Sequence, residues 1–180
     1  MHQDVARVLL TEEQIKARIR ELGKELMAEY ADKNPVFVGV LKGVVVFYSD
    51  MIRAFDAPCQ LDFMWISSYQ GTQSTGNMLV RQDVSTNLQG RHVVILEDIL
   101  DTGRSLKFVV QHLKDKGAAS VELCTLLDKP EGRVPGYEIK AKYVGFSIPN
   151  EFVIGYGLDY NEKYRNLPYV GILKPSVYEK

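Results

Sequence analysis

The sequence predicts an α/β fold, with a mostly parallel twisted sheet flanked by helices. Two observations support this class. Short apolar runs typical of buried strands alternate with amphipathic helical patterns over residues 36–127, as in parallel strands joined by crossover helices. The chain has 180 residues, of which 46% are hydrophobic and 25% charged, which is typical of a globular domain with a sizeable core.

The N-terminal elements follow from their apolar spacing. A helix is predicted over about residues 11–30, because Thr11 and Gln14 form a capping-box pattern and apolar residues follow at helical spacing. The apolar run 36–41 predicts a buried strand. Apolar residues recur at helical spacing over 44–55, which predicts a second helix.

The middle of the chain contains further strands and a long polar stretch. An apolar run at 61–66 predicts a strand. Residues 67–77 are rich in Gly, Ser and Thr and lack periodicity, so we expect a mobile loop there. Residues 78–82 are expected to pair back as a short strand, 121–127 predict another strand, and 131–142 predict a loop.

The C-terminal third has only short apolar runs broken by Gly and Pro, at 143–146, 152–154 and 169–173. We expect it to form a small irregular hood over the edge of the sheet. The hood would comprise about residues 1–10 and 143–180, over a core of about residues 30–130. No linker divides the chain, so residues 1–180 are expected to form a single domain.

Composition excludes several classes of function. The formal net charge of -1 provides no electrostatic footprint for nucleic acid or a membrane surface. The two cysteines, Cys59 and Cys124, lie far apart in apolar surroundings, which disfavours a disulfide framework or a zinc site. No signal peptide or membrane-spanning run is visible, so we expect a cytoplasmic protein.

The central block, residues 93–105, reads VVILEDILDTGRS. Four apolar residues predict a buried strand, Glu97 and Asp98 follow at its end, and Asp101 comes three residues later. Residues 102–105 form a hydroxyl-rich turn before apolar residues at helical spacing. Taken alone, Asp101 is more typical of a plain Asp-Thr-Gly turn; the complete block favours a ligand site.

The residue types in this block fit a phosphorylated sugar. A strand, turn and helix place the turn at the carboxyl end of a sheet, where a helix start offers N–H groups to a phosphate. Thr102 and Ser105 add hydroxyl donors, and Gly103 lets the backbone approach closely. Ionised carboxylates only accept hydrogen bonds, so Glu97 and Asp98 suit sugar hydroxyls or a hard cation such as Mg2+.

This block resembles the ribose-phosphate signature of the type I phosphoribosyltransferases. Other segments sharpen the resemblance: the VLKG sequence at 40–43, SSY at 67–69, Lys129, and the tail from Val144 to Leu173. Together they closely resemble the hypoxanthine-guanine phosphoribosyltransferases, especially bacterial ones, over nearly the whole chain. The tail is the more specific part, because other phosphoribosyltransferases differ there.

The resemblance implies the type I phosphoribosyltransferase fold and a purine salvage activity. Such an enzyme transfers the 5-phosphoribosyl group from 5-phosphoribosyl 1-pyrophosphate to N9 of hypoxanthine or guanine, giving IMP or GMP and pyrophosphate. It implies Mg2+ as cofactor and a homodimer or homotetramer, with no nucleic-acid or membrane partner. It does not rank hypoxanthine, guanine and xanthine.

The resemblance also implies roles for residues on the sugar-phosphate side. Glu97 and Asp98 would hold the ribose hydroxyls, partly through Mg2+. The 5-phosphate would be cradled by Thr102, Gly103, Arg104 and Ser105. Pyrophosphate would be bound by Lys42, Gly43 and Arg165, with a non-proline cis bond before the lysine, and Asp159 would lie near a second Mg2+. Ser68 and Tyr69 open the polar loop and are further candidates for substrate binding.

On the base side, the resemblance makes Asp101 and Lys129 the catalytic residues. Asp101 would be the base near purine N7, and Lys129 would contact the 6-oxo group. Phe152 would stack on the purine ring, and the Val153 backbone would contact its edge.

Two other classes of function compete with this hypothesis. A non-catalytic, nucleotide-sensing regulator with the same fold is one, although the chain has no DNA-binding segment and no basic excess. A metal-dependent phosphohydrolase is the other, with Asp98 or Asp101 as nucleophile; it would leave the Gly-rich tail and Phe152 without a role.

Overall fold

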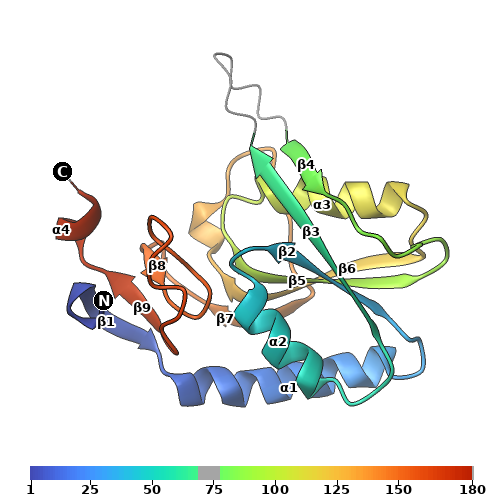
Figure 1. Ribbon diagram of the computed structural model, residues 1–180, viewed down its shortest axis with the longest axis horizontal. Helices are drawn as coiled ribbons and strands as arrows, with labels where there is room; N and C mark the ends of the chain where they lie inside the picture. The colour runs from blue at the N-terminus through green and yellow to red at the C-terminus, as the bar shows by residue number, and fades with distance from the viewer. Residues whose placement is uncertain (69–77, 180) are drawn as a thin grey trace.

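The computed structural model describes residues 1–68 and 78–179, and its larger sheet confirms the predicted mostly parallel architecture. Six strands pair in the order β4-β3-β2-β5-β6-β7, all parallel except for the antiparallel pair β3–β4 (Figure 1). Their bounds are β2 (Val36–Leu41), β3 (Gln60–Ser68), β4 (Met78–Gln82), β5 (His92–Leu100), β6 (Ser120–Asp128) and β7 (Tyr143–Ser147).

Helices cover both faces of this sheet. The predicted capping box of α1 (Glu12–Tyr30) is present: the Thr11 hydroxyl accepts from the Gln14 backbone N–H at 3.2 Å, and the Gln14 side chain accepts from the Thr11 N–H at 2.8 Å. Helix α2 (Val45–Ala54) packs beside α1 on one face, and α3 (Arg104–Asp115) lies on the other (Figure 1).

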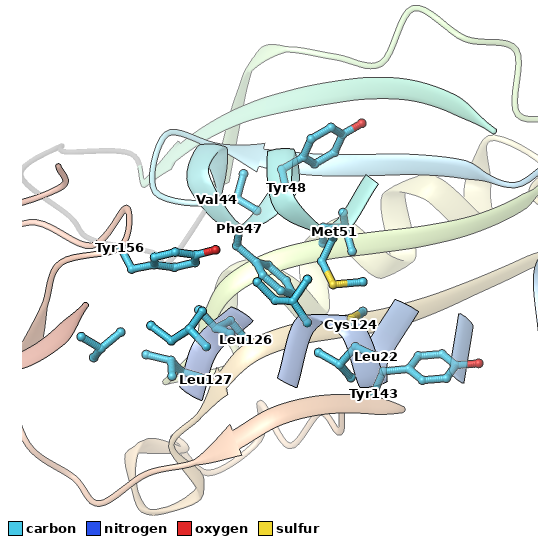
Figure 2. Packing of buried hydrophobic residues seen from close by; sticks show 14 of the residues in the cluster. Leu22, Val44, Phe47, Tyr48, Met51, Cys124, Leu126, Leu127, Tyr143 and Tyr156 are labelled. Atoms are coloured by element: carbon cyan, nitrogen blue, oxygen red, sulfur yellow. The ribbon is translucent and has the colours of Figure 1, made fainter. Parts of the chain in front are cut away.

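Alternate residues of each strand point to opposite faces and divide the core into two layers. The α1–α2 layer contains Phe47, Met51, Cys124 and Leu126, with the β6 residues facing the two helices (Figure 2). The α3 layer contains several β-branched strand residues, among them Val36, Val38, Val40, Val93 and Ile95. Both faces of the central strands are therefore buried, which explains why these strands appear as continuous apolar runs in the sequence.

A second, three-stranded antiparallel sheet forms the hood, in the order β1-β9-β8. It joins the two ends of the chain: β1 (Val5–Leu10), β8 (Val153–Ile154) and β9 (Val170–Leu173). Two short helical turns flank it, η1 (His2–Asp4) and α4 (Pro175–Tyr178). The hood is thus more regular than expected, and β7 pairs with β6 in the large sheet rather than joining the hood.

Two strands continue well beyond the ends expected from the sequence. Strand β5 continues to Leu100, because its pairing with β6 extends beyond the apolar run, so Glu97 and Asp98 lie within the strand. Strand β3 continues to Ser68, because Ser67 and Ser68, expected in a loop, pair with β4. The rest of that loop, including Tyr69, lies outside the described residues.

Neither cysteine forms a disulfide, as expected, and burial raises the pKa of the Cys124 thiol. Among the helices of the described segments, none has the length and apolar character needed to cross a bilayer.

Candidate active site

A cleft of about 410 Å³ opens where β2 and β5 end, between the large sheet and the hood loop that contains Asp159 and Arg165. This is the edge at which open α/β sheets bind ligands. Predicted site residues make up much of its lining: Lys42, Gly43, Glu97, Asp98, Asp101, Thr102, Gly103, Ser105, Asp159 and Arg165.

Glu97 and Asp98 are two buried carboxyl groups at the floor of the cleft, each residue 8% exposed. Burial, followed by the adjacent charge of Asp98, raises the pKa of Glu97 well above its usual range. Burial also raises the pKa of Asp98, although hydrogen bonds, including one from the Ile99 N–H at 2.9 Å, oppose that rise. Two such groups favour a ligand that brings hydroxyl donors or positive charge.

The turn before α3 has the features expected of a phosphate cradle. Gly103 adopts a left-handed backbone with φ of 84°, and a Cβ there would overlap the carbonyl of Tyr137. Thr102 and Ser105 line the cleft. The Arg104 guanidinium lies over the Tyr137 ring, 5.4 Å from the centroid, and Arg104 is not among the residues that line the cleft, so its part in the phosphate cradle stays a prediction.

Lys42 and Gly43 form the opposite wall. The peptide bond between Leu41 and Lys42 is cis, as the resemblance implied. A Cβ at Gly43 would overlap the carboxylate of Asp98, so the absence of a side chain lets β2 approach the buried acids.

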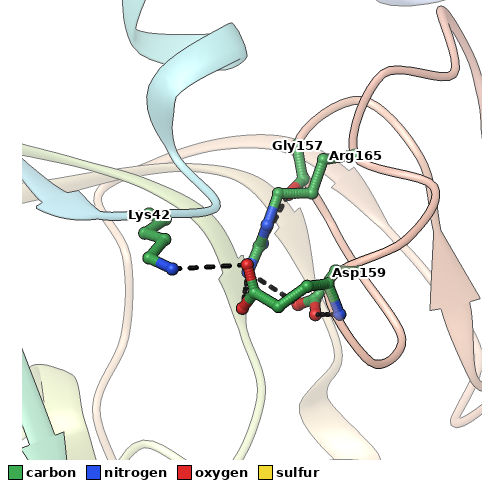
Figure 3. Close-up of polar contacts among 5 residues, drawn as sticks. Lys42, Gly157, Asp159 and Arg165 are labelled. Atoms are coloured by element: carbon green, nitrogen blue, oxygen red, sulfur yellow. Dashed lines mark hydrogen bonds and ion pairs between the residues drawn. The ribbon is translucent and has the colours of Figure 1, made fainter.

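Charged groups from the hood face Lys42 across the cleft (Figure 3). Arg165 donates to the carbonyl of Gly157 at 2.8 Å and pairs with Asp159 at 3.0 Å. Glu162 lies between Arg165 and Lys42, 3.2 Å from the first and 3.3 Å from the second. This part of the cleft therefore offers two cations to an anionic ligand, with a carboxylate between them.

The two predicted catalytic residues pair directly: Nζ of Lys129 lies 3.0 Å from Oδ2 of Asp101. Lys129 is 9% exposed and does not itself line the cleft, whereas Asp101 does. A Cβ at Gly132 would overlap the Asp101 carboxylate, so the loop after β6 also needs a glycine to close on this pair.

Arg133 holds the strand ends that carry this pair, and sequence reasoning missed it. Its Nη1 donates to the carbonyls of Leu100 and Asp101, each at 2.7 Å, and of Lys129 at 3.0 Å. Its Nη2 forms an ion pair with Asp128. An arginine in an irregular loop carries no periodic signal, so only the folded chain identifies this role.

Phe152 and Val153 lie in the hood and outside the lining of the cleft. Phe152 is 39% exposed and stacks on Tyr178 of α4, with ring centroids 5.1 Å apart and an interplanar angle of 23°. Val153 is buried in β8. Ser68 ends β3, and Tyr69 follows outside the described residues.

The proposed metal ligands do not form one preassembled cluster. Within the described part of the chain, no three Asp, Glu, His or Cys side chains are grouped to hold a metal ion. Glu97 and Asp98 are adjacent, whereas Asp159 stands on the hood side and is engaged by Arg165.

Known proteins resemble this chain closely. A family model described as the phosphoribosyl transferase domain matches residues 7–161. A hypoxanthine-guanine phosphoribosyltransferase of Streptococcus pneumoniae is 49% identical over 99% of this chain and 98% of its own length. A bifunctional TilS/HprT protein of Listeria monocytogenes is 51% identical over the whole chain, which spans only 28% of that relative.

Solved structures agree with this relationship. The structure of a hypoxanthine phosphoribosyltransferase from Staphylococcus aureus matches with a TM-score of 0.95 at 49% identity, over 100% of this chain and 97% of that one. The chain therefore belongs to the phosphoribosyltransferase family and, within it, to the hypoxanthine-guanine phosphoribosyltransferases.

Proposed function

We propose that this protein transfers the 5-phosphoribosyl group from 5-phosphoribosyl 1-pyrophosphate to N9 of hypoxanthine or guanine. The observation that carries the proposal is the composition of one cleft. It combines a helix-start turn with hydroxyl donors, two buried carboxyls and a pair of cations. Full-length relatives named hypoxanthine-guanine phosphoribosyltransferase support the same activity.

The cleft has polar groups that complement the 5-phosphate, the ribose hydroxyls and the pyrophosphate of the sugar substrate. The 5-phosphate would accept from backbone N–H groups at the start of α3 and from the hydroxyls of Thr102 and Ser105. The ribose hydroxyls would donate to Glu97 and Asp98. Lys42 and Arg165 would bind the pyrophosphate oxygens.

The donor set fits Mg2+ held jointly by protein and substrate. Mg2+ commonly takes one or two carboxylates and completes its shell with water and substrate oxygens. Glu97 and Asp98 would hold one ion, and Asp159 would lie near a second. When bound, Mg2+ neutralises charge on the leaving pyrophosphate.

In the reaction, the bond between C1′ and the pyrophosphate oxygen breaks, and its electron pair leaves with pyrophosphate. The N9 lone pair forms the new bond to C1′. Asp101 would accept the proton from N7, and Lys129 would donate to the 6-oxo group as negative charge develops there. Phe152 would supply a stacking face and the Val153 backbone an edge contact, while Gly43, Gly103, Arg104, Ser68 and Tyr69 complete the proposed substrate-binding set.

The test is initial rates of nucleotide formation from 5-phosphoribosyl 1-pyrophosphate and Mg2+, with hypoxanthine, guanine, xanthine and adenine in parallel. We expect turnover of the 6-oxopurines and not of adenine. Omission of Mg2+ with a chelator should abolish turnover. Absence of turnover with every base would reject the enzyme and favour the nucleotide-sensing regulator.

A further inference from the structure

Glu162 spans the cleft between the two proposed pyrophosphate-binding cations. Its Oε2 lies 3.3 Å from Nζ of Lys42, at the end of β2, and its Oε1 lies 3.2 Å from Nη2 of Arg165, in the hood (Figure 3). One carboxylate thus joins a cation that follows β2 of the large sheet to a cation in the hood loop between β8 and β9. A bound pyrophosphate would need the same two donors.

The backbone around Glu162 has an unusual local conformation. Asn161, Glu162 and Tyr164 all adopt left-handed conformations, with φ of 52°, 59° and 79°. This conformation disfavours residues that carry a Cβ. The Glu162 N–H donates to Asp159 at 2.8 Å, which fixes the turn.

The bridge has the properties of a displaceable contact. The Glu162 side chain is 65% exposed, and exposed ion pairs are weak and screened by salt. Hydrogen bonds from Lys42 and then Arg165 lower the pKa of Glu162, which keeps it ionised at neutral pH. A carboxylate carries one negative charge, so a more highly charged pyrophosphate would displace it.

We propose that Glu162 is an internal competitor that occupies the pyrophosphate donors until the ligand displaces it. This inference rests on the proposed function and adds a residue that sets anion affinity. Breaking the two pairs weakens pyrophosphate binding, and their re-formation favours product release.

The test compares Glu162→Gln with the wild-type protein by calorimetric titration with pyrophosphate in the presence of Mg2+. We expect pyrophosphate to bind about threefold to tenfold more tightly to the variant, as removal of two exposed pairs allows. The gain should shrink as salt rises. In steady-state assays, KM for 5-phosphoribosyl 1-pyrophosphate should fall, because the two cations are free to bind its pyrophosphate group. The value of kcat should not rise, because the product pyrophosphate leaves more slowly.

The matched control is Asp56→Asn, which removes one exposed carboxylate near the opposite edge of the sheet, just before β3 begins. It should leave pyrophosphate affinity unchanged and so exclude a general charge effect. Equal or weaker binding by Glu162→Gln would overturn the competitor role while leaving the proposed function intact. If the wild-type protein does not bind pyrophosphate at all, both proposals are wrong.

Discussion

Nζ of Lys129 lies 3.0 Å from Oδ2 of Asp101, although the two residues follow different strands of the large sheet. The pair sets a hydrogen-bond donor beside an acceptor at the side of the cleft. A 6-oxopurine that carries its proton on N7 presents the O6 acceptor and the N7–H donor next to each other on one edge, so the lysine donor and the carboxylate acceptor would each find a partner there. Neighbouring strand ends, rather than one motif, bring the two side chains of this pair together.

Asp101→Asn should lower kcat about 100-fold to 10,000-fold, because the amide cannot accept the N7 proton. The change preserves size, and Asp101 is 40% exposed, so folding should be unaffected. Titration with pyrophosphate and Mg2+ gives the control, since that affinity should be retained. A kcat close to that of the wild-type enzyme would show that another group removes the proton.

Lys129→Met should reduce discrimination between hypoxanthine and adenine while preserving most of the packing of the buried stem. In the proposed role, the lysine would donate to a 6-oxo group and would face the 6-amino donor of adenine unfavourably, so its loss should lower kcat/KM for hypoxanthine more than for adenine. Competition assays with both bases measure the ratio. Equal losses for the two bases would contradict the 6-oxo role.

Arg133→Met should impair both stability and catalysis. The variant leaves the carbonyls of Leu100, Asp101 and Lys129 without their shared donor, which should cost about 1–3 kcal/mol in the free energy of unfolding. Loss of alignment between Asp101 and Lys129 should lower kcat more than it changes KM for the sugar substrate. Urea unfolding and steady-state kinetics measure the two effects.

Arg133→Lys provides the matched comparison. Lysine keeps a positive charge for Asp128 but lacks the planar fork that reaches several acceptors, so only part of the stability and kcat should return. Full recovery with lysine would mean that charge alone matters. An unchanged kcat in Arg133→Met would remove the positioning role.

The sequence was sufficient where a short pattern determines local structure. The strands Val36–Leu41 and Met78–Gln82 were predicted with their observed bounds, and the capping box at Thr11 marked the start of α1. In each case, apolar runs or a capping pair carry the signal within a few residues.

The sequence was insufficient where a distant partner determines the structure. Strand β1 buries only Leu10 of its six residues and pairs with β9, which comes from the other end of the chain. Pairing with β6 likewise carries β5 past Glu97. The contacts of Arg133 connect residues from three segments, and no spacing in the sequence encodes them.

Asp62 offers a test of stability that is independent of catalysis. This residue of β3 is 8% exposed, and its carboxylate accepts from the backbone N–H groups of Phe63 at 2.8 Å, Ser85 at 2.9 Å and Thr86 at 2.7 Å. Burial alone would raise the pKa of Asp62, but these hydrogen bonds outweigh it and hold the pKa below its ordinary value of 3.8. The ionised carboxylate therefore fastens the loop after β4 to the sheet.

Because the pKa of Asp62 is lowered in the folded state, the unfolded chain binds the proton more readily than the folded protein does. The stabilisation by the ionised Asp62 carboxylate is therefore fully present above about pH 4. It is lost as the pH falls through the pKa of Asp62 in the folded state. Asp62→Asn should reduce the free energy of unfolding by about 1.5–3 kcal/mol at pH 7, since an amide cannot accept all three bonds with the strength of a charged group. Urea unfolding from pH 7 to pH 3 should show the difference from wild type narrowing below pH 4. Asp32→Asn, an exposed site on the loop before β2, should show little effect at any pH. A difference for Asp62→Asn that stays constant across this range would mean that shape, rather than the charge on the carboxylate, stabilises the loop.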